Sequence, residues 1–349
     1  MTETLAFFEK KKVLITGHTG FKGSWLTALL VKAGAQVVGY ALEPPTEPSM
    51  FQMLPLEKHI DSMYGDMRDL KTLTDVFDRF QPEIVFHLAA QPIVRTSYSE
   101  PVYTYAVNVM GTVNLMECVR THPSVRSVVN VTTDKVYHNN EWEYGYREID
   151  PLDGFDPYSN SKSCSESVTH SYVNSFLNAT KTAVSTARAG NVIGGGDFAP
   201  DRIIPDCFRA AEAHQPIFLR NPHSTRPYQH VLEPLCAYLE IARHQYLDFS
   251  VAGSYNIGPN YADCLTTAAL VELFVRYWRQ PLKWEVSAAP APHEAAFLKL
   301  DCSKIKQRLG WKPTWNIEQA IEKTVEWYEA YAAGEDMWAL TNRQIDQYF

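Results

Sequence analysis

The sequence is poor in the residue patterns that build metal and redox sites. Its six cysteines, at positions 118, 164, 207, 236, 264 and 302, include no Cys-x-x-Cys pair. The eleven histidines include no His-x-His or His-x-x-x-His spacing. Zinc sites and dithiol redox centres depend on such closely spaced ligands. We therefore expect no metal site, and we interpret the cysteines as reduced packing residues.

Signals for a membrane, for secretion and for nucleic acid are also missing. No apolar run is long enough to cross a bilayer, and the first residues, MTETLAFFEKKK, do not have the composition of a secretory signal. We therefore expect a cytoplasmic protein with no membrane partner. The 32 Lys and Arg residues are outnumbered by 40 Asp and Glu residues, which gives a net charge of −8. Because a nucleic-acid binder needs a basic face to neutralise phosphates, we expect no nucleic-acid partner.

A glycine-rich stretch lies between a predicted strand and a predicted helix near the start of the chain. The β-branched run at residues 11–16 leads into Gly17-His-Thr-Gly20-Phe-Lys-Gly23, apolar residues at helical spacing follow up to Gly34, and a second strand is predicted at 37–42. Glycines at this spacing allow a tight turn and a close approach of the backbone to a pyrophosphate at a helix N-terminus. Within a βαβ unit, the pattern favours dinucleotide binding over a plain tight turn.

The residues after the second strand indicate which dinucleotide is bound. Tyr40 stands where an aspartate would ordinarily receive the ribose hydroxyls, and Glu43 follows shortly after it. No arginine appears before Arg68. Because a 2′-phosphate needs a cationic fork, the sequence favours NAD, although Lys22 keeps NADP open. Asp66 either accepts a hydrogen bond from an adenine amino group or serves as a helix N-cap or loop carboxylate.

Strands and helices alternate through the first half of this 349-residue chain, which is longer than one hydrophobic core usually supports. Strands are predicted at 83–90, 127–133 and 182–190, and helices at 105–119 and 158–176. This alternation predicts an α/β fold with a Rossmann-type, doubly wound parallel sheet that binds ligands at the carboxyl ends of its strands. From about Ala189 the chain is richer in glycine, proline and aspartate. We predict an NAD-binding Rossmann domain over residues 1–188, with returning segments at about 228–262 and 304–325, and a smaller, discontinuous C-terminal α/β substrate domain made mostly from residues 189–349.

A candidate catalytic group lies at the end of one strand and on the helix that follows it. Tyr158 and Lys162 are four residues apart, so their side chains share a helix face. An ammonium so placed lowers the pKa of the phenol, so that Tyr158 can act as the base when an alcohol is oxidised by hydride transfer. Thr133, at the strand end, can hydrogen-bond the same substrate oxygen. Asp134 and Lys135 follow directly; a lone Asp-Lys pair is usually a solvated turn, but the sheet places this one at the mouth of the site.

These motifs together resemble the extended short-chain dehydrogenase/reductase family, from about residue 11 to the end of the chain. The resemblance rests on the glycine stretch, HLAAQP at 87–92, VNVMGT at 107–112, the strand end at Thr133 and the Tyr158/Lys162 pair. The segments RAGNVIGGGD (188–197), RPYQHVLE (226–233) and SYNIGP (254–259) are similar to the nucleotide-sugar branch of that family. Most nucleotide-sugar 4,6-dehydratases carry Thr-Asp-Glu at the strand end. The Thr-Asp-Lys of this chain resembles the subgroup that acts on CDP-glucose.

The resemblance implies a reaction as well as a fold. Bound NAD⁺ would take a hydride from C4 of the hexose while Tyr158 removes the hydroxyl proton, water would leave across C5 and C6, and the hydride would return to C6. Asp134, protonated in a closed and desolvated site, would be the acid at the C6 hydroxyl. Lys135 stands where a glutamate would be, and we hypothesise that its neutral amine removes the C5 proton. The alternative is that Lys135 pairs with Asp134 and only stabilises the enolate, leaving another group as the base.

The resemblance also implies the binding residues. For the nucleotide sugar, Arg226 matches a diphosphate-binding arginine and Asn191 a sugar-nucleotide asparagine. Gln91 and Asn256 are further candidates, while Arg202 and Arg220 either share the phosphate load or are solvated. A loop-capping or surface role is the alternative for each of them. The implied NAD contacts are Gly17, Thr19, Gly20, Phe21, Lys22, Gly23, Tyr40, Asp66, Met67, Leu88, Ala89, Ala90, Asn108, Tyr158 and Lys162.

Two other functions compete with dehydration. A nucleotide-sugar 4-epimerase or reductase uses Tyr158 and Lys162 but needs neither an acid nor a base after Thr133, so Asp134 and Lys135 favour the dehydratase. A non-catalytic NAD-sensing protein has no use for the tyrosine and the lysine. The resemblance further implies a homodimer or homotetramer that supplies deoxysugars for a bacterial surface polysaccharide such as the O-antigen of lipopolysaccharide.

Overall fold

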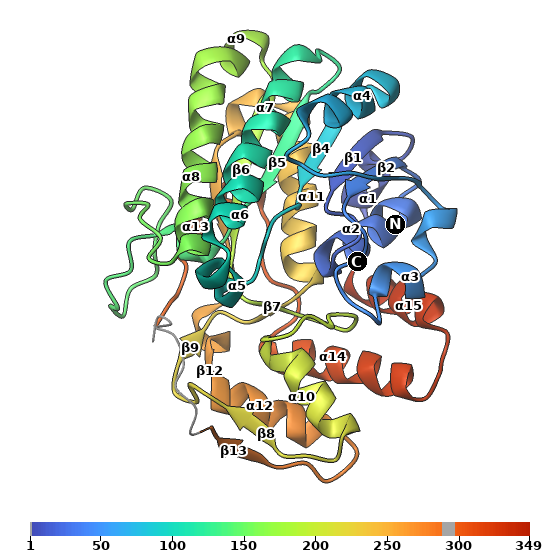
Figure 1. The fold of residues 1–349 in the computed structure, drawn as a ribbon, viewed down its shortest axis with the longest axis vertical. Coiled ribbons are helices and arrows are strands. Elements are labelled where there is room, and N and C mark those ends of the chain that lie inside the picture. Colours follow the sequence, from blue (N-terminus) through green and yellow to red (C-terminus); the bar gives the residue numbers. More distant parts are fainter. Residues whose placement is uncertain (1, 288–296) are drawn as a thin grey trace.

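The computed structural model describes residues 2–287 and 297–349 (Figure 1). A sheet of seven parallel strands has the order β11-β6-β5-β4-β1-β2-β3, so the predicted doubly wound parallel sheet is confirmed. Its strands are β1 (Lys12–Thr16), β2 (Gln36–Ala41), β3 (Asp61–Tyr64), β4 (Ile84–His87), β5 (Ser127–Val131), β6 (Ala183–Ala189) and β11 (Ser254–Ile257). The order reverses between β1 and β4, and in such sheets ligands bind outside the carboxyl ends at this point.

Each face of the sheet carries its own hydrophobic core, because successive side chains of a strand point to opposite faces. Within β1, Leu14 belongs to the core under α4 (Leu70–Phe80), α7 (Gly111–Thr121) and α8 (Pro157–Tyr172). Val13 and Ile15 belong to the core on the other face, which α2 (Phe21–Lys32) and α11 (Leu232–Leu247) cover together with α1 (Glu3–Phe7). Figure 1 shows α7 and α8 side by side in front of the sheet. With both faces covered, the central strands β1, β4 and β5 are almost fully buried, as parallel strands usually are.

A smaller lobe lies below the carboxyl ends of the strands (Figure 1). It contains α10 (Ile203–Glu212), α12 (Thr267–Tyr277) and α14 (Ile317–Ala332), and three short strand pairs: β7 (Val192–Ile193) with β10 (Gln229–His230), β9 (Thr225–Arg226) with β12 (Leu265–Thr266), and β8 (Ile217–Leu219) with β13 (Trp284–Val286). Between these segments the chain returns to the sheet to form α11 and β11. The domain boundaries that we predict from the sequence stay a prediction.

The C-terminal helices tie the lobe back to the sheet. α13 (Ser303–Leu309) packs against β11, and α15 (Met337–Tyr348) packs against α14. α15 also reaches the first half of the chain, because Lys32 forms an ion pair with Asp346 and His59 stacks on Trp338. None of the helices in the described part of the chain is long and apolar enough to cross a membrane.

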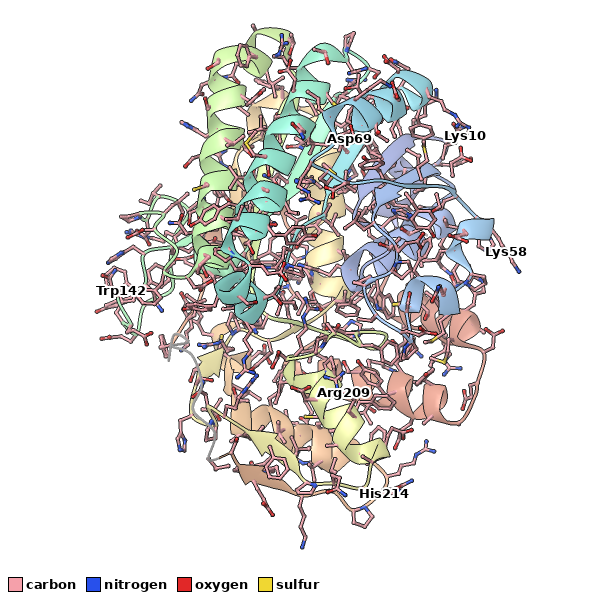
Figure 2. The ribbon with its side chains drawn as sticks, in the orientation of Figure 1. Lys10, Lys58, Asp69, Trp142, Arg209 and His214 are labelled. Atoms are coloured by element: carbon pink, nitrogen blue, oxygen red, sulfur yellow. The ribbon has the colours of Figure 1, made fainter. Side chains whose placement is uncertain are left out.

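Short helices and single turns make most of the remaining connections. They are α3 (Met50–Met53), α5 (Val94–Ser99), α6 (Pro101–Tyr105), α9 (Asn178–Thr180), η1 (Leu56–Lys58), η2 (Ala106–Met110), η3 (Asp134–Val136), η4 (Val173–Leu177), η5 (Phe249–Val251) and η6 (Tyr261–Asp263). η2 and η4 are wider π-type turns that continue directly into α7 and α9. Figure 2 shows the side chains around this framework, with Trp142 on a loop that projects beside α8.

Candidate active site

A cleft of about 1420 Å³ lies between the carboxyl ends of the strands and the smaller lobe. Its wall includes residues that follow β1, β4 and β5, the start of α8, and segments of the lobe around Asn191, Arg202 and Arg226. Pockets for single small ligands usually measure about 300 to 1,000 Å³. The cleft is therefore large enough for two ligands, such as a dinucleotide and a second nucleotide.

The glycine-rich turn leaves the start of α2 open to the cleft. Gly17 has a φ of +77°, and a Cβ at this position would lie 2.6 Å from the backbone nitrogen of Ala89. A Cβ on Gly23 would lie 2.0 Å from the carbonyl oxygen of Gly17, so the helix and the turn are in backbone contact. A Cβ on Gly20, in contrast, would approach only the Gly17 oxygen, at 3.5 Å. The Gly20 side is thus an open surface at the helix N-terminus, which suits a bound pyrophosphate.

Capping fixes where α8 begins and therefore where Tyr158 lies. Asp156 accepts a hydrogen bond from the Ser159 backbone at 3.0 Å, and Pro157 occupies the first turn. One turn further on, the ammonium of Lys162 is buried and donates to the carbonyl of Val131 at 3.1 Å. Burial lowers the pKa of Lys162 to about 8, against the opposing attraction of Glu166.

The pKa of Tyr158 differs from our expectation that a neighbouring ammonium would lower it. Burial raises the pKa of Tyr158 to about 12, although a hydrogen bond with Thr133 and the charge of Arg202 oppose the shift. In the protein alone, loss of water around the phenolate therefore outweighs the nearby positive charge. Tyr158 is held neutral until a ligand supplies further charge.

Thr133 caps the turn η3, which begins with Asp134 and Lys135 shortly after β5. Asp134 is fully buried, and its Oδ1 accepts hydrogen bonds from Thr133 Oγ1 at 3.0 Å and from Lys135 Nζ at 3.2 Å. Its other oxygen, Oδ2, is buried and has no partner among the described residues. A buried carboxylate oxygen rarely stays unpaired, so Oδ2 is available to a ligand in the cleft. The structure thus brings these three residues together with Tyr158 and Lys162, as predicted.

Lys22 reaches the same point from the start of α2. Burial lowers the pKa of Lys22 to about 7, with repulsion from Arg202, Lys162 and Lys135 adding to the shift and attraction by Asp134 opposing it. Such interactions require Lys22 to lie close to the catalytic group. The residue lines the cleft, as its prediction as a cofactor contact requires.

The lobe contributes three arginines to the cleft, and they differ in their partners. Arg202 forms an ion pair with Asp197 at 2.8 Å, and Arg220 forms one with Asp201 at 2.9 Å. Burial tends to lower the pKa of Arg202, but Asp197 raises it overall, so the guanidinium stays charged. Arg226 is 5% exposed, donates to the Thr225 carbonyl at 3.3 Å, and forms no ion pair with any described residue. A buried arginine without a carboxylate is suited to an anionic ligand.

Asn191 offers a second unpaired atom at this end of the cleft. Its Oδ1 is buried and has no hydrogen-bond partner among the described residues. The side chain lines the cleft next to β7. This position suits the predicted contact with a sugar nucleotide.

Three predicted binding residues are used inside the fold. Tyr40 is fully buried and donates to the Asp66 carbonyl at 2.9 Å. Asn108 holds the backbone of Gln91 through both of its side-chain atoms, at 2.8 and 3.1 Å. Asn256 donates to the Tyr146 carbonyl at 2.7 Å and accepts from Tyr137. Tyr40, Asn108 and Asn256 are not among the residues that line the cleft, so their role as ligand contacts stays a prediction.

Gln91 and Asp66 line the cleft but already have partners. The Gln91 amide donates to Thr104 at 2.9 Å and accepts from the Ile93 backbone at 2.6 Å, so it shapes its own loop. Asp66 forms an ion pair with Arg68 at 2.6 Å. The hydrogen bond from Arg68 holds the pKa of Asp66 below its usual value. The other predicted cofactor contacts all line the cleft: Thr19, Phe21, Met67, Leu88, Ala89 and Ala90.

The sequence analysis missed the residues that support the catalytic group from behind. The ring of His87 and the hydroxyl of Thr16 share a hydrogen bond of 2.7 Å. Burial lowers the pKa of His87 to about 3, so the ring is neutral. Glu166 lies four residues after Lys162 on the same face of α8 and pairs with Arg188. The four-residue spacing from Lys162 is the sequence signal that could have identified Glu166. No cluster of metal-ligating side chains occurs in residues 2–287 and 297–349.

Comparison with known proteins agrees with this site. The sequence model of the family described as GDP-mannose 4,6 dehydratase matches residues 14–324. The chain belongs to this family. It is also 46% identical to a CDP-glucose 4,6-dehydratase of Salmonella typhimurium, over 98% of this chain and 97% of that protein. A dTDP-glucose 4,6-dehydratase of Xanthomonas campestris is 28% identical over 90% of this chain and 92% of its own length.

Solved structures of a nucleotide-sugar dehydratase and an epimerase share the fold. A dTDP-glucose 4,6-dehydratase from Bacillus anthracis in complex with NAD matches with a TM-score of 0.76 and 21% identity, over 93% of this chain and 98% of that chain. A UDP-glucose-4-epimerase from Stenotrophomonas maltophila with bound NAD matches with a TM-score of 0.82 and 18% identity, over 93% and 99%. Dehydratases and epimerases thus share this framework, and the site residues must distinguish them.

Proposed function

We propose that the chain is an NAD-dependent CDP-glucose 4,6-dehydratase, a hydro-lyase that converts CDP-D-glucose to CDP-4-dehydro-6-deoxy-D-glucose and water. The observation that carries the proposal is the Asp134-Lys135 pair beside Tyr158, because an epimerase or a reductase needs no acid and base at this strand end. The 46% identity to a CDP-glucose 4,6-dehydratase supports both the reaction and the nucleotide.

The residues of the glycine-rich turn fit NAD. The open side of Gly20 and the N-terminus of α2 would hold the pyrophosphate, and Leu88, Ala89 and Ala90 would line the path toward the catalytic group. When bound, NAD⁺ supplies the acceptor for the C4 hydride and returns that hydride to C6. The protein's own residues move the protons.

The first proton leaves the C4 hydroxyl. Tyr158, as the phenolate that the positive charge of bound NAD⁺ would favour, accepts it, while Thr133, which hydrogen-bonds to Tyr158, also orients the hydroxyl. Thr133 Oγ1 donates in turn to Asp134 Oδ1 at 3.0 Å. A proton accepted by Tyr158 can therefore pass along Thr133 to Asp134.

The second pair of transfers completes the elimination. Once C4 is a ketone, Lys135 removes the acidified C5 proton as a neutral amine, and Asp134 protonates the departing C6 hydroxyl through its unpaired Oδ2. The hydroxide and the proton from the C4 hydroxyl together leave as water. Lys135 then returns a proton to C5, which leaves both residues as they began.

The cation-rich end of the cleft suits the nucleoside diphosphate. Arg226, with Arg202 and Arg220 nearby on the cleft wall, would bind the diphosphate, and Asn191 would contact the sugar nucleotide. Concentrating arginines here compensates for the net charge of −8, which by itself repels such a substrate. We also propose, from the family resemblance, a cytoplasmic homodimer or homotetramer; sedimentation velocity measures its size.

Mass spectrometry tests the function. Purified protein is incubated separately with CDP-, dTDP-, UDP- and GDP-hexoses and catalytic NAD⁺. We expect CDP-glucose alone to lose one water, without net reduction of NAD⁺. An unchanged mass with a rearranged sugar would instead show epimerisation, and no change with any substrate would favour a protein that only binds NAD.

The variant Lys135→Met tests the role of the base. Removing the amine should reduce dehydration by about 100- to 10,000-fold, the usual contribution of a general base. Oxidation at C4 should continue, because Tyr158 and Lys162 are intact. Exchange of the C5 proton with deuterated water, followed by NMR, separates the two steps. Exchange at the wild-type rate would show that Lys135 only stabilises the enolate.

A further inference from the structure

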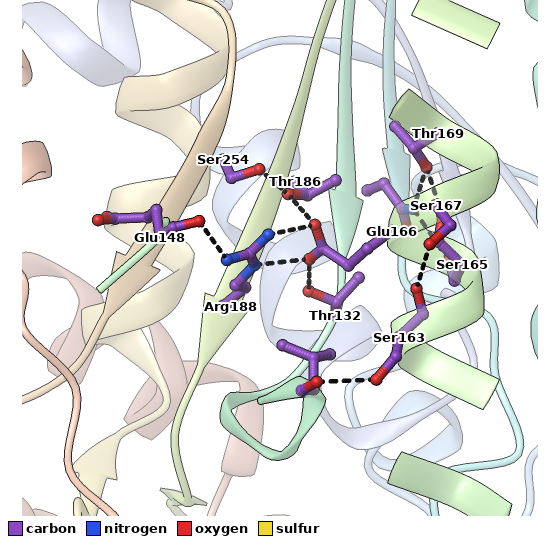
Figure 3. Close-up of polar contacts among 12 residues, drawn as sticks. Thr132, Glu148, Ser163, Ser165, Glu166, Ser167, Thr169, Thr186, Arg188 and Ser254 are labelled. Carbon is purple, nitrogen blue, oxygen red and sulfur yellow. Dashed lines mark hydrogen bonds and ion pairs between the residues drawn. The ribbon is translucent and has the colours of Figure 1, made fainter. Parts of the chain in front are cut away.

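A buried ion pair lies directly behind the catalytic turn. Arg188 of β6 donates to Glu166 of α8 through Nε at 3.0 Å and through a terminal nitrogen at 2.8 Å. The two side chains are only 4% and 3% exposed. Figure 3 shows the pair between the strands and α8, with contacts to hydroxyl groups on both sides. An ion pair of this geometry is rigid, because each charge would be left unpaired if the other moved.

The first attachment of this pair to the catalytic turn is at Thr132. Thr132 Oγ1 donates to Glu166 Oε1 at 2.5 Å, one residue before Thr133. Thr186, on the neighbouring strand, donates to the other oxygen of Glu166 at 2.7 Å. Glu166 thus receives two equivalent hydroxyl bonds, and only one of them comes from the segment that carries the acid and the base.

The second attachment lies beyond Lys135. The other terminal nitrogen of Arg188 donates to the hydroxyl of Tyr137 at 2.8 Å and to the carbonyl of Glu148 at 3.1 Å. Ser163, on the same helix as Glu166, donates to the carbonyl of Val136 at 2.8 Å (Figure 3). The segment is therefore fixed on both sides of Asp134 and Lys135.

The acid and the base have few anchors of their own. Among the described residues, the side chain of Asp134 hydrogen-bonds only to its chain neighbours Thr133 and Lys135. Their placement in the cleft therefore depends on how the backbone of residues 132–137 is held. Tyr158 and Lys162 differ, because they sit on α8 and are placed by the helix itself.

We propose that Glu166 and Arg188 are positioning residues for the dehydration step, holding Asp134 and Lys135 through Thr132 and Tyr137. This inference rests on the proposed function. Since misplacement of a reacting group by about 1 Å can cost on the order of 100-fold in rate, loosening the turn should slow elimination. It should slow C4 oxidation much less, because α8 and not the segment 132–137 carries Tyr158 and Lys162.

Two matched variants separate this role from a general effect on packing. Thr132→Val and Thr186→Val each remove one buried hydroxyl that donates to Glu166, but only Thr132 belongs to the catalytic segment. Thr132→Ser restores the hydroxyl at the same place. Tyr137→Phe removes the second attachment and provides an independent test should Thr132→Val fold poorly.

The experiment follows a single turnover of CDP-glucose with enzyme in excess and saturating NAD⁺. Quenching with borodeuteride labels every 4-ketone, and mass spectrometry then distinguishes ketones that retain the C6 oxygen from those that have lost water. With Thr132→Val and Tyr137→Phe we expect dehydration to slow by about 10- to 100-fold while C4 oxidation changes by less than about threefold. Thr186→Val and Thr132→Ser should resemble the wild type.

The outcomes are distinct. The positioning role is overturned if Thr132→Val and Thr186→Val slow both steps equally. It is also overturned if Thr132→Val and Tyr137→Phe do not slow dehydration. In both cases the proposed function still holds, because the wild type dehydrates CDP-glucose. A wild type that forms no dehydrated product overturns the proposed function, and this inference with it.

Discussion

The two walls of the cleft are built in different ways. On the wall below β1 and β4, the shape comes from backbone contacts, such as the 2.6 Å approach that a Cβ on Gly17 would make to Ala89. On the wall formed by the smaller lobe, the shape comes from charged side chains and their partners, such as Arg202 on Asp197 and Arg220 on Asp201. The first wall faces the proposed cofactor and the second the proposed nucleotide sugar.

This difference suggests how each wall responds to change. A backbone contact tolerates no added atom, whereas a side chain can be replaced and its neighbours can adjust. Substitutions on the cofactor wall should therefore damage both folding and binding. Substitutions on the substrate wall should weaken binding and leave folding almost unchanged.

The largest expected effect is that of Gly17→Ala. The new alanine must adopt a φ of +77°, and its Cβ would collide with the backbone of Ala89. Strain in this region costs about 1 to 3 kcal/mol and overpacking about as much again, so the free energy of unfolding should fall by about 2 to 6 kcal/mol. Denaturant unfolding measures the stability, and calorimetry measures the loss of NAD affinity.

Gly334→Ala is the matched control for Gly17→Ala. Gly334 has a similar φ of +73°, but a Cβ there would meet no atom within 4 Å. Gly334→Ala should lower the free energy of unfolding by about 1 to 2 kcal/mol, the strain of a left-handed backbone alone. It should leave NAD affinity unchanged. If both alanine variants were equally destabilised, backbone contact would not be what shapes the cofactor wall.

The next largest effect belongs to the substrate wall. Arg226→Gln removes a buried charge that has no carboxylate partner among the described residues. Loss of charged hydrogen bonds to a diphosphate should weaken binding of CDP by about 1.5 to 3 kcal/mol, as measured by calorimetry. NAD affinity and the melting temperature should stay close to wild type.

Arg276→Gln provides the comparison for Arg226→Gln. Arg276 is exposed and pairs with Glu318 at 3.1 Å on the surface of the lobe. Its removal should change neither CDP binding nor stability by more than about 0.5 kcal/mol. Equal weakening of CDP binding by both variants would mean that the overall charge, and not Arg226, attracts the diphosphate.

The same contrast explains what could be predicted from the sequence. The glycine spacing and the strand-helix alternation predict the sheet and the cofactor wall, because these follow from backbone rules that act over a few residues. The direction of a single polar side chain depends on tertiary neighbours. The sequence therefore does not reveal that the side chains of Asn108 and Asn256, which we predict as ligand contacts, also hold Gln91 and Tyr146.

The helices of the smaller lobe show a second limit. The richness in proline from about Ala189 does not exclude helices, because Pro205 lies in the first turn of α10, where its missing N–H costs nothing. Pro234 likewise lies in the first turn of α11, and a long apolar pattern follows it. Where the apolar pattern is short, proline alone does not distinguish a loop from the start of a helix.

The last expected effect is a pH dependence and concerns Lys22, a charged side chain on the wall that backbone contacts otherwise shape. Burial lowers the pKa of Lys22 from 10.5 to about 7 in the folded protein. Between these two values the unfolded chain binds more protons at this residue than the folded protein does. The free energy of unfolding should therefore rise with pH over this window, by up to about 1.4 kcal/mol per pH unit from Lys22.

Lys22→Met isolates this contribution, because methionine fills the space without binding a proton. Below pH 7 the wild type carries the full cost of a buried ammonium, so the variant should be more stable there, and its advantage should shrink steadily as the pH rises toward 10. Urea unfolding of both proteins across this range, without added nucleotide, measures the difference, and Lys71→Met, at an 86% exposed lysine, should show no such trend. Parallel curves for Lys22→Met and the wild type would mean that the ammonium stays charged at no cost. The cofactor wall would then accommodate charge as readily as the substrate wall does.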